Sequence, residues 1–226
     1  VFSLIGFVFL FLLQLLQGYL MGNPQGLSGV KWDLSLNTAA SFITNTNWQA
    51  YSGESTLSYL TQALGLTVQN FVSAATGIAV LFALIRGFMK VEAKGLGSFW
   101  VDITRTIIHV LIPLNLVISV LLVAGGVIQN LEPAQTVSLV EPIAVNVDGE
   151  IIENAQIDIA SKTVTVNGQM VPQAKIITEQ FVPMGPAASQ VAIKQTGTNG
   201  GGYMGVNSAH PLDNPNAYTN FIEMTS

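Results

Sequence analysis

Three long apolar stretches, each with at most one charged side chain, constrain the fold of this chain most strongly. They cover residues 1–21, roughly 64–89 and roughly 103–128. About 20 apolar residues in a helix cross the hydrocarbon core of a bilayer. Only 9% of all residues are charged, against roughly 25% in an ordinary globular domain. The sequence therefore predicts a membrane protein with three spans. Because residue 1 already lies inside an apolar run, we expect the chain to be an internal fragment.

The basic residues indicate an orientation. Half of the eight lie within twenty positions, from the end of the second span to the start of the third, at Arg86, Lys90, Lys94 and Arg105. Basic residues gather in cytoplasmic loops of membrane proteins. We therefore expect a cytoplasmic linker at 90–102, where Asp102 and Arg105 are spaced to form a local helical pair.

Two uncharged polar stretches lie outside these spans, at 44–49 (TNTNWQ) and 197–202 (GTNGGG). A short run precedes each, at 34–42 and 186–195, and neither run is long enough to cross a bilayer. Non-helical backbone at membrane depth is tolerated only where protein buries it or where it lines a wet cavity. The pattern predicts two half-membrane pore helices, each followed by a re-entrant loop on the extracytoplasmic side.

An internal repeat supports this interpretation. A shift of 152 residues aligns Thr46, Asn47, Tyr51 and Gly53 with Thr198, Asn199, Tyr203 and Gly205. The predicted fold class is an all-α membrane protein built from helix–pore helix–filter loop–helix repeats, the unit of cation channels. We place one repeat at 1–89 and an incomplete second repeat at 103–226.

The second repeat contains an insertion at about 129–184. Its residues alternate between apolar and polar, and it contains Asp148-Gly149 and Asn167-Gly168, both typical of type I′ hairpin turns. We expect a small extracytoplasmic β-meander of three or four strands there.

The candidate binding residues are uncharged. In the first loop they are Thr44, Asn45, Thr46, Asn47 and Gln49, and in the second loop Thr198, Asn199, Gly200 and Gly201. Carbonyl and hydroxyl dipoles can replace the water of a large, weakly hydrated ion, whereas carboxylates would favour divalent or smaller cations. Potassium is therefore preferred over calcium or sodium. The alternative is that these residues only cap helices and form turns.

Several residues near the two loops also need an interpretation. Asp33 and Glu54 flank the first loop, where they either concentrate cations or form ordinary solvated surface. We expect Trp48, Tyr51 and Tyr203 to pack behind the loops. The segment 200–205 satisfies G-x-G-x-x-G, but a dinucleotide site needs a strand before it and a helix after it. No nucleotide is therefore expected on this chain, and the net charge of −5 gives no basic surface for nucleic acid.

Several strings resemble one known family. Residues 44–54 (TNTNWQAYSGE), 65–71 (GLTVQNF), 197–202 and 207–211 (NSAHP) are similar to the potassium-binding subunit family of the Kdp-type potassium-transporting ATPase. The similarity covers nearly the whole chain except the insertion from 132 to about 178. It implies the first repeat and most of the second, out of four.

The resemblance implies a multi-pass protein of the potassium-channel-like superfamily in a bacterial or archaeal inner membrane, in contact with membrane lipid. It would select potassium at an extracytoplasmic filter and pass it to a separate P-type ATPase subunit in a complex with small accessory subunits. Thr44 to Asn47 and Thr198 to Gly201 would coordinate the ion, while Gln49 and Gly200 would tune selectivity. The chain itself would not hydrolyse ATP.

Two alternatives remain open. A passive potassium channel or a potassium symporter of the same superfamily would have the same loops. The second alternative is a membrane-anchored extracytoplasmic module without transport. An adjacent gene for a P-type ATPase would favour the pump.

Overall fold

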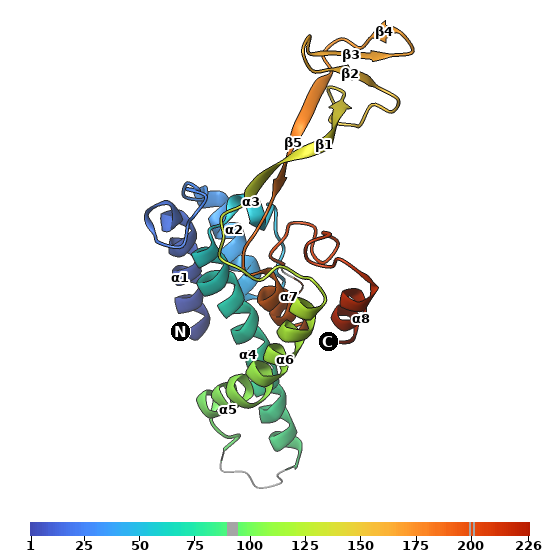
Figure 1. Ribbon diagram of the computed structural model, residues 1–226. Coiled ribbons are helices and arrows are strands. Elements are labelled where there is room, and N and C mark those ends of the chain that lie inside the picture. The colour runs from blue at the N-terminus through green and yellow to red at the C-terminus, as the bar shows by residue number, and fades with distance from the viewer. Residues whose placement is uncertain (90–94, 199, 201) are drawn as a thin grey trace. The chain divides into compact units, whose positions relative to one another are not determined.

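The computed structural model describes residues 1–89, 95–198, 200 and 202–226, and the chain divides into two compact units (Figure 1). The helical unit comprises Val1–Pro133 and Met184–Ser226, and the β unit comprises Ala134–Pro183. The helices of the first unit are α1 (Phe2–Leu16), α2 (Trp32–Ile43), α3 (Gly53–Thr56), α4 (Val68–Met89), α5 (Phe99–Thr106), α6 (Ile112–Ala124), α7 (Ala187–Thr196) and α8 (Ala217–Thr225).

Among the described residues, three helical segments are long and apolar enough to cross a membrane: Phe2–Tyr19, Thr61–Met89 and Phe99–Ala124. The three predicted spans are thus confirmed as membrane-length helices. The third begins earlier than predicted and ends at Ala124, because Gly125 and Gly126 follow and Gly126 has a left-handed φ of 98°. Lys90 and Lys94 of the expected cytoplasmic linker lie outside the described residues, so the orientation stays a prediction.

The second and third spans are not uniform α-helices. A π-helical turn, Thr61–Thr67, precedes α4, and another, Ile107–Leu111, lies between α5 and α6. Pro113 explains the second turn, because proline has no N–H to donate to the preceding helical turn. The Asn115 side chain donates to the carbonyl of Leu111 at 2.7 Å. This bond gives the Leu111 carbonyl, close to the proline, a side-chain donor.

An ion pair joins the two spans. Asp102 accepts hydrogen bonds from the guanidinium of Arg86, one of them at 2.7 Å, and this contact joins α5 to α4. The expected local pair of Asp102 with Arg105 is therefore wrong. A carboxylate buried at a helix crossing gains more from a bidentate guanidinium on the neighbouring helix than from an exposed side chain on its own.

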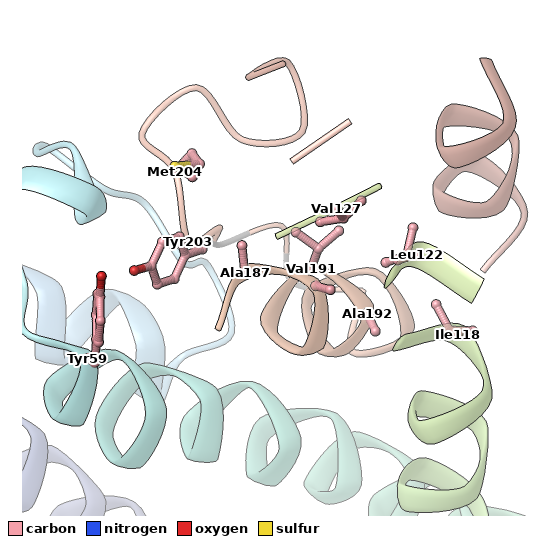
Figure 2. Close-up of a cluster of buried hydrophobic side chains, with 10 residues drawn as sticks. Tyr59, Ile118, Leu122, Val127, Ala187, Val191, Ala192, Tyr203 and Met204 are labelled. Carbon is pink, nitrogen blue, oxygen red and sulfur yellow. The ribbon is translucent and has the colours of Figure 1, made fainter. Parts of the chain in front are cut away.

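The helices α2 and α7 are short; α7 is largely buried, whereas α2 buries one face and exposes Trp32 and Leu36. With 12 and 10 residues they extend about 18 and 15 Å, half of the roughly 30 Å that a bilayer core requires. Each packs in its own apolar cluster. Around α2 the buried residues are Leu10, Val30, Ala39, Phe42, Leu57 and Leu66. Figure 2 shows the cluster around α7, which includes Ile118, Leu122, Val191, Tyr203 and Met204.

The β unit contains two small sheets. Its strands are β1 (Gln135–Val145), β2 (Gln156–Asp158), β3 (Thr163–Val166), β4 (Gln169–Met170) and β5 (Lys175–Val182). β2, β3 and β4 form a three-stranded antiparallel meander, whereas β1 pairs antiparallel with β5. The unit is therefore not one continuous meander, because its two ends close on each other.

Only one of the two predicted type I′ turns is present. Asn167 and Gly168 both have positive φ, 52° and 79°, and connect β3 to β4 as a type I′ turn requires. At the other site Gly149 has positive φ but Asp148 does not. There the Asn146 side chain accepts hydrogen bonds from the amides of Asp148 and Glu150. This side-chain capping holds Asp148 in a different turn.

Gln17, at the end of the first span, connects three segments of the helical unit. It is fully buried, donates to the carbonyls of Ser28 and Thr56 at 2.8 Å each, and accepts from the amide of Ser58 at 3.0 Å. In the full-length protein we expect Gln17→Leu to lower stability by about 2–4 kcal/mol, because buried backbone groups lose their partners. Thermal unfolding in detergent measures this. Tyr19→Leu, at a position 90% exposed, is the matched control, and equal unfolding temperatures for the two variants would contradict the role of Gln17.

Candidate functional site

The first uncharged turn begins where α2 ends. The amides of Thr46 and Asn47 both donate to the carbonyl of Ser41, at 3.0 and 3.2 Å. Asn45 and Asn47 have left-handed φ values of 62° and 55°, a conformation that asparagine adopts more readily than most side chains. The backbone therefore alternates in handedness from one residue to the next.

Side chains from α4 hold this turn in place. Asn45 Oδ1 accepts a hydrogen bond from the Ser73 hydroxyl at 2.7 Å, and the side-chain Nδ2 of Asn47 donates one to Asn70 Oδ1 at 2.6 Å. The two asparagine side chains thus face α4. Within the described part of the chain, no hydrogen bond reaches the backbone carbonyl oxygens of residues 44–47. Asn45 can therefore offer an ion its backbone carbonyl, and Asn47 can offer its backbone carbonyl or its side-chain Oδ1, which has no partner among the described residues.

The threonines of the first turn differ from the asparagines. Thr44 and Thr46 are exposed, and their hydroxyls lie 3.1 Å apart. The Thr44 hydroxyl also donates to the Ala40 carbonyl at 2.9 Å. Both residues thus remain accessible on the open side of the turn.

The second turn repeats the conformation of the first. It follows α7, and Thr198 and Gly200 have left-handed φ values of 55° and 75°. Asn199 and Gly201, predicted as site residues, lie outside the described residues.

The structural correspondence between the turns is shifted from the predicted one. The helix ends Ile43 and Thr196 are 153 positions apart, as are the left-handed residues Asn45 and Thr198, and Asn47 and Gly200. The offset of 152 that aligns the most identities therefore differs by one from the offset that aligns the backbone.

The Gln49 side chain joins the two turns directly. Its Oε1 accepts from the amide of Gly202 at 2.9 Å, and its Nε2 donates to the carbonyl of Gly202 at 3.1 Å. The side-chain amide of Gln49 therefore pairs with the backbone of Gly202 through one donated and one accepted hydrogen bond. A second link lies nearby, since Glu54 accepts from the amide of Gly205 at 2.8 Å. Glu54 therefore links the segment after the first turn to the segment after the second, and is not simply solvated surface.

Gly202 itself is closely surrounded. A Cβ at this position would lie 2.9 Å from Asn207 Oδ1 and 3.0 Å from Lys194 Nζ. The Asn207 side chain also approaches Gly200, with its Nδ2 3.7 Å from the corresponding Cβ position there. Sequence reasoning missed Asn207, Asn70 and Ser73 as supports of the turns. The usable signal was that the last two lie three residues apart, on one face of a helix whose first half is polar.

The predicted aromatic packing holds only in part. Tyr203 is fully buried, and its ring centre lies 6.3 Å from that of Tyr59 (Figure 2). Trp48, in contrast, is 76% exposed. The expectation that Trp48 packs behind the turn is wrong, because the two flanking side chains, Asn47 and Gln49, take the inward positions.

Two hollows adjoin the turns. One is lined by Asn47, Trp48, Gln49, Gly205 and Asn207 and lies where the two turns meet. The other is bounded by residues of α1, α2 and α4 and by Thr44 and Asn45. The carbonyl ends of α2 and α7 lead into the turns, and the partial negative charge at a helix C-terminus favours a cation. The described residues of the two turns offer neutral oxygens from backbone carbonyls and hydroxyls.

The G-x-G-x-x-G segment does not have the surroundings of a dinucleotide site. Helix α7 precedes it, and irregular turns occupy residues 203–216 before α8 begins. The glycines instead serve a turn that is bonded to Gln49 and Glu54.

Comparisons with known proteins give a consistent result. The family described as Potassium-transporting ATPase A subunit matches residues 1–226. The potassium-transporting ATPase potassium-binding subunit of Clostridium perfringens is 58% identical over 225 residues, covering 100% of this chain and 34% of that protein. The proteins of the same name from Methylococcus capsulatus and Listeria welshimeri are 54% and 51% identical over 99% of this chain, covering 37% and 34% of their own lengths.

Together with the three membrane-length helices, these matches place the chain among membrane transport subunits. More narrowly, the chain belongs to the Potassium-transporting ATPase A subunit family. It spans about a third of the length of the curated relatives it matches.

The Gln49 contact generates a prediction for the full-length protein. Gln49→Leu keeps the size of the side chain but removes both bonds to Gly202. We expect faster amide hydrogen exchange at residues 202–205 and a loss of stability of about 1–3 kcal/mol, because two backbone groups lose their partner. Ala50→Leu introduces the same side chain at the adjacent exposed position and should change neither quantity. Unaltered exchange in the Gln49 variant would show that the contact does not hold the second turn.

Proposed function

We propose that this chain supplies two of the backbone-lined loops of a potassium filter in an ATP-driven importer. In this proposal α2 and α7 are pore helices of two helix–pore helix–loop–helix repeats, and their loops face the extracytoplasmic side. The ion then passes to a separate ATPase subunit, so this chain binds and translocates potassium without hydrolysing ATP.

One observation carries the proposal. Two uncharged turns follow short helices that each pack in an apolar cluster, and each turn has left-handed residues at alternate positions, Asn45 and Asn47 in one and Thr198 and Gly200 in the other. Alternating handedness turns successive carbonyls toward the same side, whereas a strand turns them to opposite sides. Rings of such carbonyls replace the hydration shell of potassium in known filters.

The chemistry of the turns favours potassium over other cations. Residues 44–49 and 197–202 contain no carboxylate, and neutral dipoles replace the water of a large monovalent ion more readily than that of a small or divalent one. In this proposal the carbonyls of residues 44–47 and 198–201, together with the exposed hydroxyls of Thr44 and Thr46, form the ligands. Gln49 acts by holding Gly202 and does not touch the ion.

The names of the relatives support the complex. They are called potassium-binding subunits of a potassium-transporting ATPase, which fits a P-type ATPase partner, small accessory subunits, and an inner-membrane location among lipids. A passive channel or a symporter would use the same turns. The full-length protein distinguishes these, because an importer accumulates potassium only with its ATPase partner and ATP, whereas a channel conducts without them.

Gly200→Asp tests the filter in the full-length complex. A carboxylate within the ring favours smaller cations, so we expect the preference for potassium over rubidium to change by about tenfold. Paired uptake of the two ions, in cells or in liposomes with ATP, measures this preference.

Gly149→Asp is the matched control. Gly149 also has positive φ, 85° against 75° for Gly200, and open space around it, so both variants carry the same backbone cost of about 1 kcal/mol. If both variants retained the wild-type ratio of the two ions, Gly200 would have no place in the filter.

A further inference from the structure

A buried lysine lies directly behind the second turn. Lys194, in the last turns of α7, is 1% exposed, and among the described residues its Nζ has no hydrogen-bond partner. The same Nζ lies 3.0 Å from the position of a Cβ on Gly202. Burial lowers the pKa of this ammonium. An aliphatic side chain would fill the same space without the cost of burying a charge, so packing alone does not account for a lysine here.

Two carboxylates balance this charge from different segments. Asp213, in the loop before α8, is 0% exposed, and no side chain among the described residues donates a hydrogen bond to either of its oxygens. Glu223, on α8, is 6% exposed, and one of its oxygens accepts from the Gln195 side chain at 3.1 Å. The charges of both carboxylates raise the pKa of Lys194 and so oppose the effect of burial.

The cluster carries a net charge at neutral pH. Burial raises the pKa of Asp213 to about 6, although the charge of Lys194 opposes this rise. Asp213 is therefore mostly ionised above pH 7. The formal charges of Lys194, Asp213 and Glu223 sum to a single negative charge. Glu54, which accepts from the Gly205 amide, is the other carboxylate that acts on Asp213.

We propose that Lys194 is a positioning and specificity-determining residue of the second turn, whose ammonium acts as a tethered cation that offsets Asp213 and Glu223. Without it, two buried carboxylates would place a double negative charge behind oxygens that otherwise act as neutral dipoles. A stronger negative field favours small cations over potassium. This inference rests on the proposed filter function and adds the groups that set the field at the filter.

The test uses the full-length protein purified in complex with its ATPase partner. The measured quantities are the potassium and sodium concentrations that half-maximally stimulate ATP hydrolysis. We expect Lys194→Met to reduce the ratio of sodium to potassium requirement by about tenfold. Lys194→Met/Asp213→Asn restores a single negative charge, so its ratio should return to within about threefold of wild type. Lys194→Arg should keep the wild-type ratio.

Rescue by a second substitution separates charge balance from packing. A purely structural lysine predicts that the double variant is at least as impaired as Lys194→Met, and that result would overturn the inference. An unchanged ratio in Lys194→Met would overturn it as well. Lys175→Met, at an exposed lysine of the β unit, is the control and should match wild type.

A further variant applies if Lys194→Met does not assemble. Glu223→Gln removes the net negative charge, so we expect the potassium requirement to rise about threefold or more with the maximal rate unchanged. An unchanged requirement would overturn the inference. A wild-type complex that potassium does not stimulate would overturn the proposed function, and the inference with it. If the wild-type complex prefers potassium and the variants keep the same ion requirements, the inference about Lys194 is wrong but the proposed function stands.

Discussion

The pairing of backbone polar groups in two uncharged turns is the constraint on which this structure depends. A backbone group left unpaired in an apolar environment costs several kcal/mol. In the first turn, the carbonyl of Ser41 accepts hydrogen bonds from two backbone amides, and side chains of α4 bond to the two asparagine side chains. In the second, Gln49 takes both the amide and the carbonyl of Gly202. These contacts hold both turns in place. Among the described residues, the backbone carbonyls of residues 44–47 receive no hydrogen bond.

The helices around the turns follow from this requirement. Short helices deliver the chain to the turns, and each needs its own apolar surroundings because neither reaches across a bilayer. Around α2 these are α1 and the segment leading into α4, and around α7 they are α6 and the residues after the second turn. Polar residues within the spans serve the same end. Asn115, which bonds the Leu111 carbonyl near Pro113, also accepts from Thr196 at the end of α7.

Periodicity and composition predicted the elements of this fold better than its contacts. The spans and both short helices follow from runs of apolar residues, so the sequence alone locates them. The pairing of β1 with β5, and of Arg86 with Asp102, joins segments whose separation carries no local signal. At the site, the type of residue indicated uncharged turns, but the sequence did not show that Asn45 and Asn47 face α4. Trp48 was misplaced for a similar reason, because only the backbone shows which side chains point inward.

The Gln49 contact also explains why the two turns differ in sequence. In the backbone correspondence of 153 residues, Gln49 and Gly202 occupy equivalent positions, and they bond to each other. A side chain at 202 would collide with Asn207 and Lys194. Glutamine at 49 and glycine at 202 are therefore complementary. The Gln49 side-chain amide bonds both the N–H and the carbonyl of Gly202, and the absence of a side chain at 202 leaves room for this contact. Two identical turns could not form this contact, so divergence between them is a condition for their association.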